Sequence, residues 1–127
     1  MSDWGIMPLF IVEKTRENKY LMRYKQTIKS QVPSEDVQHF LHQPELASVG
    51  EFIRILRTSY QNKGKILDVS VEGDDRLSQV VILWDSEQSL TEYNQQLIEA
   101  FPTLHSIREK YHADNSISWE VIYENVP

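Results

Sequence analysis

The sequence predicts an α+β domain in which a four-stranded antiparallel sheet is covered by two helical regions. Three observations predict it. Lys65–Glu72 and Leu77–Trp84 have the pattern of two strands joined by the turn residues Gly73-Asp74-Asp75. A long amphipathic helical pattern lies on each side of this hairpin, and an alternating strand pattern lies at each end. The order is therefore β-α-β-β-α-β, which is the ferredoxin-like arrangement.

The first strand of this order is expected over Tyr20–Lys29, where apolar and aromatic residues alternate with charged ones at the period of a strand. Upstream, Met7–Val12 is short, apolar and rich in β-formers, so residues 1–19 are expected to form an extra strand or an arm. The domain itself is expected to span residues 20–127. A short helix is expected around Ser34–Leu41, between Pro33 and Pro44.

The first long helix is expected to begin at Ser48. Ser48 and Glu51 have the spacing of a capping box, in which each side chain accepts from a free backbone N–H of the other. Apolar residues then recur every three or four positions at Val49, Ile53, Leu56 and Tyr60. Gly64 is expected to end the helix.

The strand Leu77–Trp84 is apolar on both faces, which is typical of a central strand covered on both sides. It ends in Asp85-Ser86, a corner that starts the second helical region, over about residues 87–113. Pro102 cannot donate a backbone hydrogen bond, so this region should kink or split there. A last strand is expected over Ile117–Val126.

This order of elements leaves one face of the sheet without helices, because right-handed crossovers place both helical regions on the same side. Large exposed apolar patches are rare, so the other face should be covered. A second copy of the chain, packed sheet against sheet in a two-chain barrel, is the economical cover. The alternative is that the N-terminal arm covers this face within one chain.

The corner Trp84-Asp85-Ser86, followed by Leu90 and Tyr93, resembles the antibiotic biosynthesis monooxygenase-like family of dimeric α/β barrels. The resemblance covers about residues 20–126. It implies a homodimer with a pocket between helices and sheet in each subunit. The family includes cofactor-free oxygenases, haem-degrading enzymes and members without known activity, so the fold does not specify a reaction.

Carried over residue by residue, the resemblance makes Tyr93 and His105 the candidate catalytic residues. Tyr93 falls where the haem-degrading branch has a tryptophan, and His105 where it has a histidine, after a two-residue insertion near Pro102. The chain departs from that branch in its first strand, which has no asparagine. We expect neither haem nor another cofactor.

Six residues are candidates to line a ligand cavity, because aromatic rings and an imidazole can stack on or bond to a planar molecule. They are Tyr24, Trp84, Tyr93, Phe101, His105 and Trp119. The alternative for each is ordinary packing, since aromatic residues at strand and helix periods usually belong to the core. His39 and His42 are three residues apart, but two histidines without a third ligand do not make a metal site, and none is expected.

Composition excludes several classes of function. The net charge of −6 disfavours nucleic acid and anionic membrane surfaces as partners. The chain has no cysteine, which excludes disulfides, thiolate metal sites and cysteine nucleophiles. We therefore expect a cytoplasmic protein.

Two hypotheses about function follow. The first is a cofactor-independent monooxygenase that acts on an aromatic or lipophilic substrate. The second is a non-catalytic dimeric domain that binds a small molecule or a protein.

Overall fold

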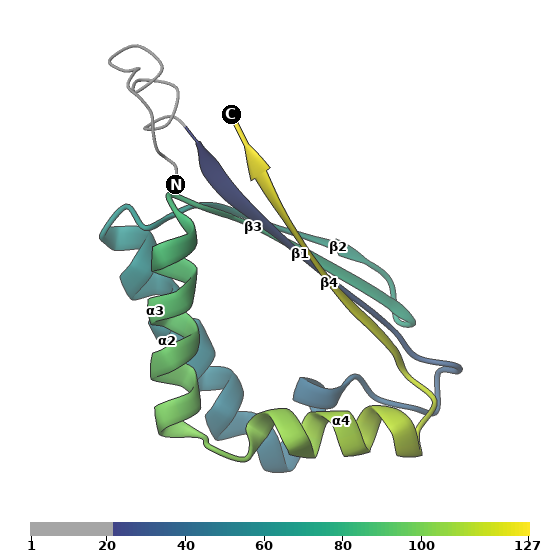
Figure 1. Ribbon diagram of the computed structural model, residues 1–127. Coiled ribbons are helices and arrows are strands. Elements are labelled where there is room, and N and C mark those ends of the chain that lie inside the picture. Colours follow the sequence, from purple (N-terminus) through teal and green to yellow (C-terminus); the bar gives the residue numbers. More distant parts are fainter. Residues whose placement is uncertain (1–21) are drawn as a thin grey trace, which may run out of the picture.

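The computed structural model describes residues 22–127, so the expected N-terminal arm lies outside the described residues. Four strands form one antiparallel sheet in the order β2-β3-β1-β4. The helices lie on one side of this sheet (Figure 1). The elements are β1 (Arg23–Gln31), the short 3-10 helices η2 (Phe40–His42) and η3 (Pro44–Leu46), α2 (Ala47–Asn62), β2 (Ile66–Gly73), β3 (Leu77–Trp84), α3 (Glu87–Ala100), α4 (Leu104–Asp114) and β4 (Ser118–Val126). The expected ferredoxin-like fold is confirmed.

Strand register assigns each side chain of the sheet to one of two faces. On β1, Ile28 pairs with Val80 of β3 and with Val121 of β4. Because side chains alternate along a strand, these residues share one face, which is the face toward the helices. Thr27 pairs with Val81 and Ile122 on the opposite, outer face.

Helix α2 starts at a different residue from the one expected. It begins at Ala47, directly after η3, and its N-cap Leu46 forms no side-chain cap. Ser48 therefore lies within the first turn, so the expected capping box is wrong. The two consecutive 3-10 turns already direct the chain into the helix. The C-terminal end is as expected, because Gly64 takes a positive φ of 75° and its amide N–H bonds to the Gln61 carbonyl at 3.0 Å.

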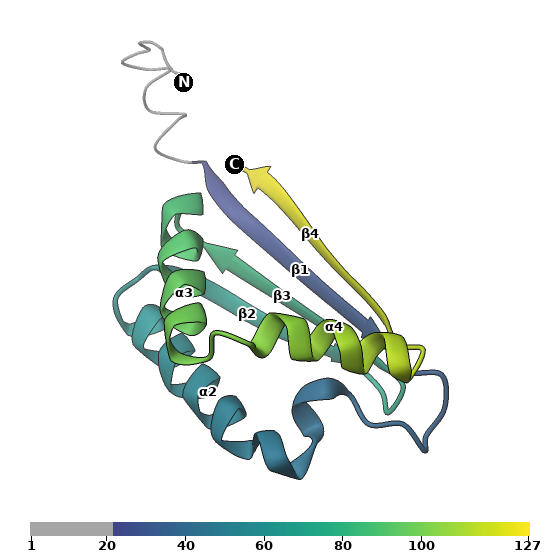
Figure 2. The same ribbon diagram turned by 60° about the horizontal axis from the view of Figure 1, so that its bottom comes forward.

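The second helical region splits at Pro102, as expected. Ser86 caps α3 by accepting from the Ser89 amide at 3.2 Å. The helix ends at Ala100, and α4 then runs across the end of α3 rather than continuing along it (Figure 2). Only part of the helical layer therefore lies flat on the sheet.

The buried side chains form two separate clusters. One lies where α2 and α3 meet β3, and contains Tyr60, Ile66, Ile82, Trp84, Leu90 and Tyr93. The other lies where α2 meets η2 and α4, and contains Phe40, Val49, Ile53 and Leu104. Leu97 packs against both clusters.

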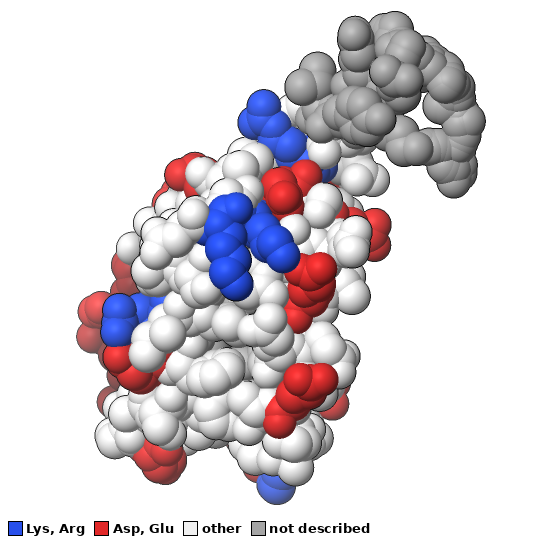
Figure 3. Space-filling model, turned by 90° about the vertical axis from the view of Figure 1, so that its left-hand side faces the viewer, with Lys and Arg blue, Asp and Glu red and all other residues white. Residues whose placement is uncertain are grey.

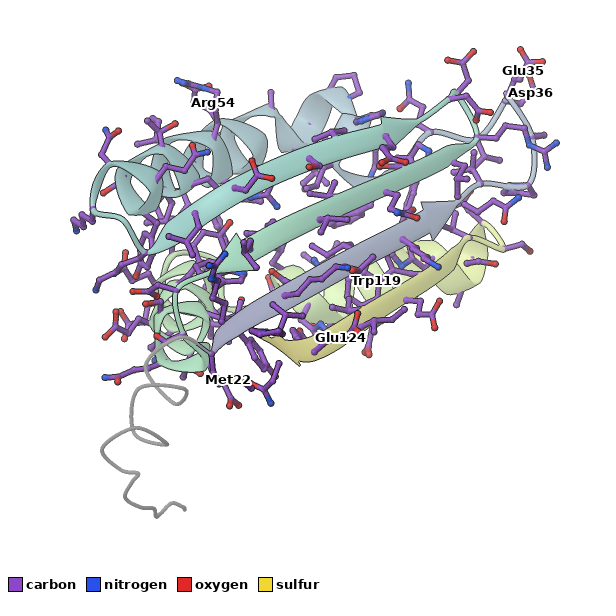
Figure 4. All side chains as sticks on the ribbon, turned by 90° about the horizontal axis from the view of Figure 1, so that it is seen from above. Met22, Glu35, Asp36, Arg54, Trp119 and Glu124 are labelled. Atoms are coloured by element: carbon purple, nitrogen blue, oxygen red, sulfur yellow. The ribbon has the colours of Figure 1, made fainter. Side chains whose placement is uncertain are left out.

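No helix formed by residues 22–127 lies on the outer face of the sheet (Figure 4). Half-buried Val81, Leu83 and Ile122 lie in its middle, and charged residues flank them. Lys25 pairs in register with Glu124, and Lys29 with Glu120. Across the helical side, acidic and basic side chains lie next to one another (Figure 3). No helix within residues 22–127 is long and apolar enough to cross a membrane.

Candidate functional site

A cavity of about 570 Å³ lies between the helices and the sheet, in the space that the turn at Pro102 leaves open. Its walls take residues from both core clusters, including Ile82 and Tyr93 from one and Phe40, Ile53 and Leu104 from the other. The sheet contributes its helix-facing side chains, namely Gln26, Ile28, Ser30, Val71, Ser78, Val80, Trp119, Val121 and Tyr123. The volume is within the usual range for small-molecule sites, roughly 300–1,000 Å³.

Four of the six predicted cavity residues line this cavity. They are Tyr93, Phe101, His105 and Trp119. Phe101 also packs edge-on against Phe52 of α2, with ring centroids 5.2 Å apart. These four residues therefore lie together on the wall of one cavity between helices and sheet.

The other two, Trp84 and Tyr24, do not line it. Trp84 is completely buried, and its indole N–H donates to the Gln26 side-chain oxygen at 3.1 Å. Tyr60 and Tyr93 close over it edge-on, with ring centroids 6.1 and 5.2 Å from its own. Tyr24 stacks on Tyr123, with centroids 5.8 Å apart. Both rings are therefore occupied in packing at one end of the sheet.

Tyr93 is a buried hydrogen-bond donor rather than a base. Its hydroxyl has no hydrogen-bond partner among the described residues. Burial raises the pKa of this phenol, and the nearby Arg57 guanidinium opposes the shift only in part. The phenol therefore stays protonated near neutral pH.

His105 lies at the rim. Its side chain is 63% exposed, and Nε2 lies 3.2 Å from a Glu109 carboxylate oxygen. Its Nδ1 lies 3.2 Å from the Arg108 guanidinium. A histidine in this position can hold Arg108 in place, but it does not point its reactive nitrogens at the cavity interior.

Among the cavity-lining residues that were not predicted, four are basic side chains that are buried or half-buried. Arg57 comes from α2, Arg108 and His112 from α4, and His39 from the segment before η2. His39 and His112 are buried, and desolvation, with nearby positive groups, lowers the pKa of both imidazoles. They are therefore neutral near pH 7. The available signal was the helical spacing of Arg108 in the apolar stripe Leu104, Arg108, Tyr111, where a cation is unexpected.

Four polar atoms of cavity-lining residues are buried without a hydrogen-bond partner among residues 22–127. They are Nε of Arg57, Nε of Arg108, Nε2 of His39 and the hydroxyl of Tyr93. All four residues line the cavity. A buried polar group without a hydrogen bond costs about 1–3 kcal/mol, and these four groups belong to residues around one cavity.

The histidine pair considered as a metal site does not gain a third ligand. The rings of His39 and His42 pack edge-on with centroids 5.4 Å apart, and Nδ1 of His39 lies 3.0 Å from the Ser30 hydroxyl. Over the described part of the chain, no group of three or more His, Cys, Asp or Glu side chains is arranged to hold a metal ion.

Comparison with known proteins yields only distant structural similarity. No family model matches the sequence, and no curated protein matches it significantly. The chain is similar to a conserved protein from Methanosarcina mazei Go1, with 14% identity, a TM-score of 0.46, and coverage of 85% of this chain and 96% of that one. It is also similar to a dimeric ferredoxin-like protein from an uncultured marine organism, with 12% identity, a TM-score of 0.47, and coverage of 87% and 90%. Similarity at this level assigns no function.

Proposed function

We propose that this protein binds a small aromatic or lipophilic molecule in the cavity between its helices and its sheet. The observation that carries the proposal is the composition of the cavity wall, in which apolar side chains from both core clusters surround a few convergent polar groups. Pockets of this size and composition are the usual form of a small-molecule site. The half-buried ring of Phe101 can contact a planar ligand, and the exposed ring of Trp119 also lines the cavity, with the Arg108 guanidinium 4.5 Å from its centroid.

Blocking the cavity tests this proposal. Ile98 lines the cavity from α3 and is 54% exposed, so Ile98→Trp places an indole at the opening without disturbing the core. We expect naphthol to bind the unmodified protein and to bind Ile98→Trp at least about tenfold more weakly, measured by calorimetry. Gln95→Trp, which puts the same ring on an exposed position of the same helix, is the control and should bind naphthol normally. Equal binding by both variants would place the ligand elsewhere.

We also propose that the protein is a homodimer that packs through the outer face of its sheet. Val81, Leu83 and Ile122 form an apolar centre there, and no described residue outside the sheet covers it. The charged residues around this centre alternate in sign from strand to strand, with lysines on β1 and glutamates on β4. A second sheet related by a two-fold axis can place opposite charges against each other.

Oxidation of the bound molecule is a second candidate function, as a cofactor-independent monooxygenase. Such a reaction starts when a base removes a proton from the substrate, and neither Tyr93 nor His105 is suited to this step. The observation in its favour is His39, a buried cavity-lining imidazole whose pKa is lowered by desolvation and by the nearby His42, although a backbone hydrogen bond with Asp75 opposes the shift. Oxygen uptake that depends on the bound aromatic alcohol would separate this reaction from binding alone.

A further inference from the structure

We infer that the ligand of this cavity is an anion, a carboxylate on an aromatic or aliphatic body, and that Arg108 binds the carboxylate. The inference rests on the proposed binding function and narrows its ligand class. It starts from a contrast in charge. The whole chain has a net charge of −6, yet two arginines and four histidines line the cavity, and no aspartate or glutamate among the described residues does.

Arg108 is held in one orientation before any ligand arrives. Its guanidinium carbon lies 4.5 Å from the centroid of the Trp119 ring, so the flat group stacks on the indole. One of its terminal nitrogens lies 3.2 Å from Nδ1 of His105. Nε is buried and has no hydrogen-bond partner among residues 22–127. Because Nε is enclosed by protein, the terminal nitrogens of the guanidinium are the groups that can donate to a carboxylate.

The acidic residue nearest in sequence does not neutralise this charge. Glu109 is exposed and directs its carboxylate to Nε2 of His105 in the solvent, at 3.2 Å. Burial lowers the pKa of Arg108, and the nearby Glu109 carboxylate and Tyr123 oppose this shift only in part. A charge in this state is costly, and a bound anion would offset the cost.

The neighbours of Arg108 are donors as well. Arg108 and His39 lie close enough to His112 to lower the pKa of its imidazole. A neutral imidazole has one N–H donor, and the tautomer determines whether Nδ1 or Nε2 carries the hydrogen. At the α2–α3 end of the cavity, the Arg57 guanidinium lies beside the Tyr93 hydroxyl and adds a second basic group to the lining. The site therefore offers donors and lacks fixed anionic acceptors, which suits a carboxylate better than an amine or an alcohol.

Two probes that differ only in charge test the inference on the full chain. Naphthoate and naphthamide have the same ring and nearly the same shape. We expect naphthoate to bind the unmodified protein at least about tenfold more tightly, since a hydrogen bond to a charged group is the stronger kind. In Arg108→Gln this preference should fall to about twofold or less, while naphthamide binding stays the same. Lys110→Gln removes the same charge from the exposed side of α4, where Lys110 pairs with Asp114, and should keep the full preference.

The outcomes separate the two proposals. If both probes bind equally well and Ile98→Trp blocks both, the cavity is a binding site but the anion inference is overturned. If neither probe binds at millimolar concentration, the proposed function itself falls. Should Arg108→Gln fail to fold, Arg108→Lys keeps the charge but loses the fork, and a preference that falls several-fold but not completely supports the inference. An undiminished preference in either folded variant contradicts it.

Discussion

Trp84 and Trp119 show how differently one residue type can serve in this fold. Trp84 is completely buried on the central strand β3, and its N–H is satisfied by Gln26. Trp119 lies on the edge strand β4, is 36% exposed and stacks against Arg108. A strand pattern places both on the helix-facing side of the sheet, but it does not say which position the helices cover. The position of the helices therefore decides that Trp84 belongs to the core and Trp119 to the cavity wall.

Trp84→Phe tests the core role. The change removes the donor to Gln26, leaves a buried acceptor without a partner and opens a small cavity between Tyr60 and Tyr93. We expect the free energy of unfolding in urea to fall by about 2 kcal/mol or more. Trp119→Phe is the matched control, and it should cost less than about 1 kcal/mol because its ring is partly in solvent. Equal losses would contradict the assignment of Trp84 to the core.

The basic residues that line the cavity could not be predicted from the sequence, for a related reason. His39 and His112 are 73 positions apart, and they meet only because η2 packs against α4, where Phe40 lies 5.6 Å from Tyr111 between ring centroids. Arg57 and Tyr93 likewise come from different helices. Spacing within one element can be read from sequence, whereas contacts between elements depend on the angle at which they pack.

At the scale of elements, prediction succeeded where one local interaction dominates. Gly64 ended α2 because few other residues adopt a positive φ, and Pro102 split the second helical region because proline cannot donate its backbone hydrogen bond. The start of α2 was mispredicted because Ser48 and Glu51 match the capping pattern while two preceding 3-10 turns have already begun the helix. The capping pattern reports a local preference, and the neighbouring turn outweighed it.

The two serines provide a direct test of these helix starts. Ser86 caps α3 and accepts from the Ser89 amide, so Ser86→Ala should lower the free energy of unfolding by about 1 kcal/mol. Ser48 is exposed within the first turn of α2 and forms no cap. Ser48→Ala should therefore leave stability unchanged or raise it by a few tenths of a kcal/mol, because alanine favours helix. Urea unfolding measures both, and a loss near 1 kcal/mol in Ser48→Ala would restore the capping box.

At the scale of the whole molecule, the two faces of the sheet differ in what covers them. On the helical side, α4 turns away from the direction of α3 (Figure 1), and a cavity lies there whose walls take residues from both core clusters. The outer side has an apolar centre, with Val81 on a central strand, that no helix within residues 22–127 covers. The sequence pattern of β3, apolar on both faces, predicts that both faces of the sheet are covered. It does not predict what covers each face.

A single substitution tests what covers the outer face of the sheet. Val81 is half-buried at the middle of that face, paired with Thr27, so Val81→Lys places a charge where a second sheet would pack. We expect the unmodified protein to sediment at twice its chain mass of 15.0 kDa and Val81→Lys at the mass of one chain. Ile107→Lys, a change at an exposed position of α4, is the control and should stay dimeric. If the unmodified protein sediments as one chain at micromolar concentration, the sheet face is covered within the chain, as the alternative of an N-terminal arm requires. In that case Val81→Lys should destabilise the monomer, because the charge would then be buried against the chain's own residues.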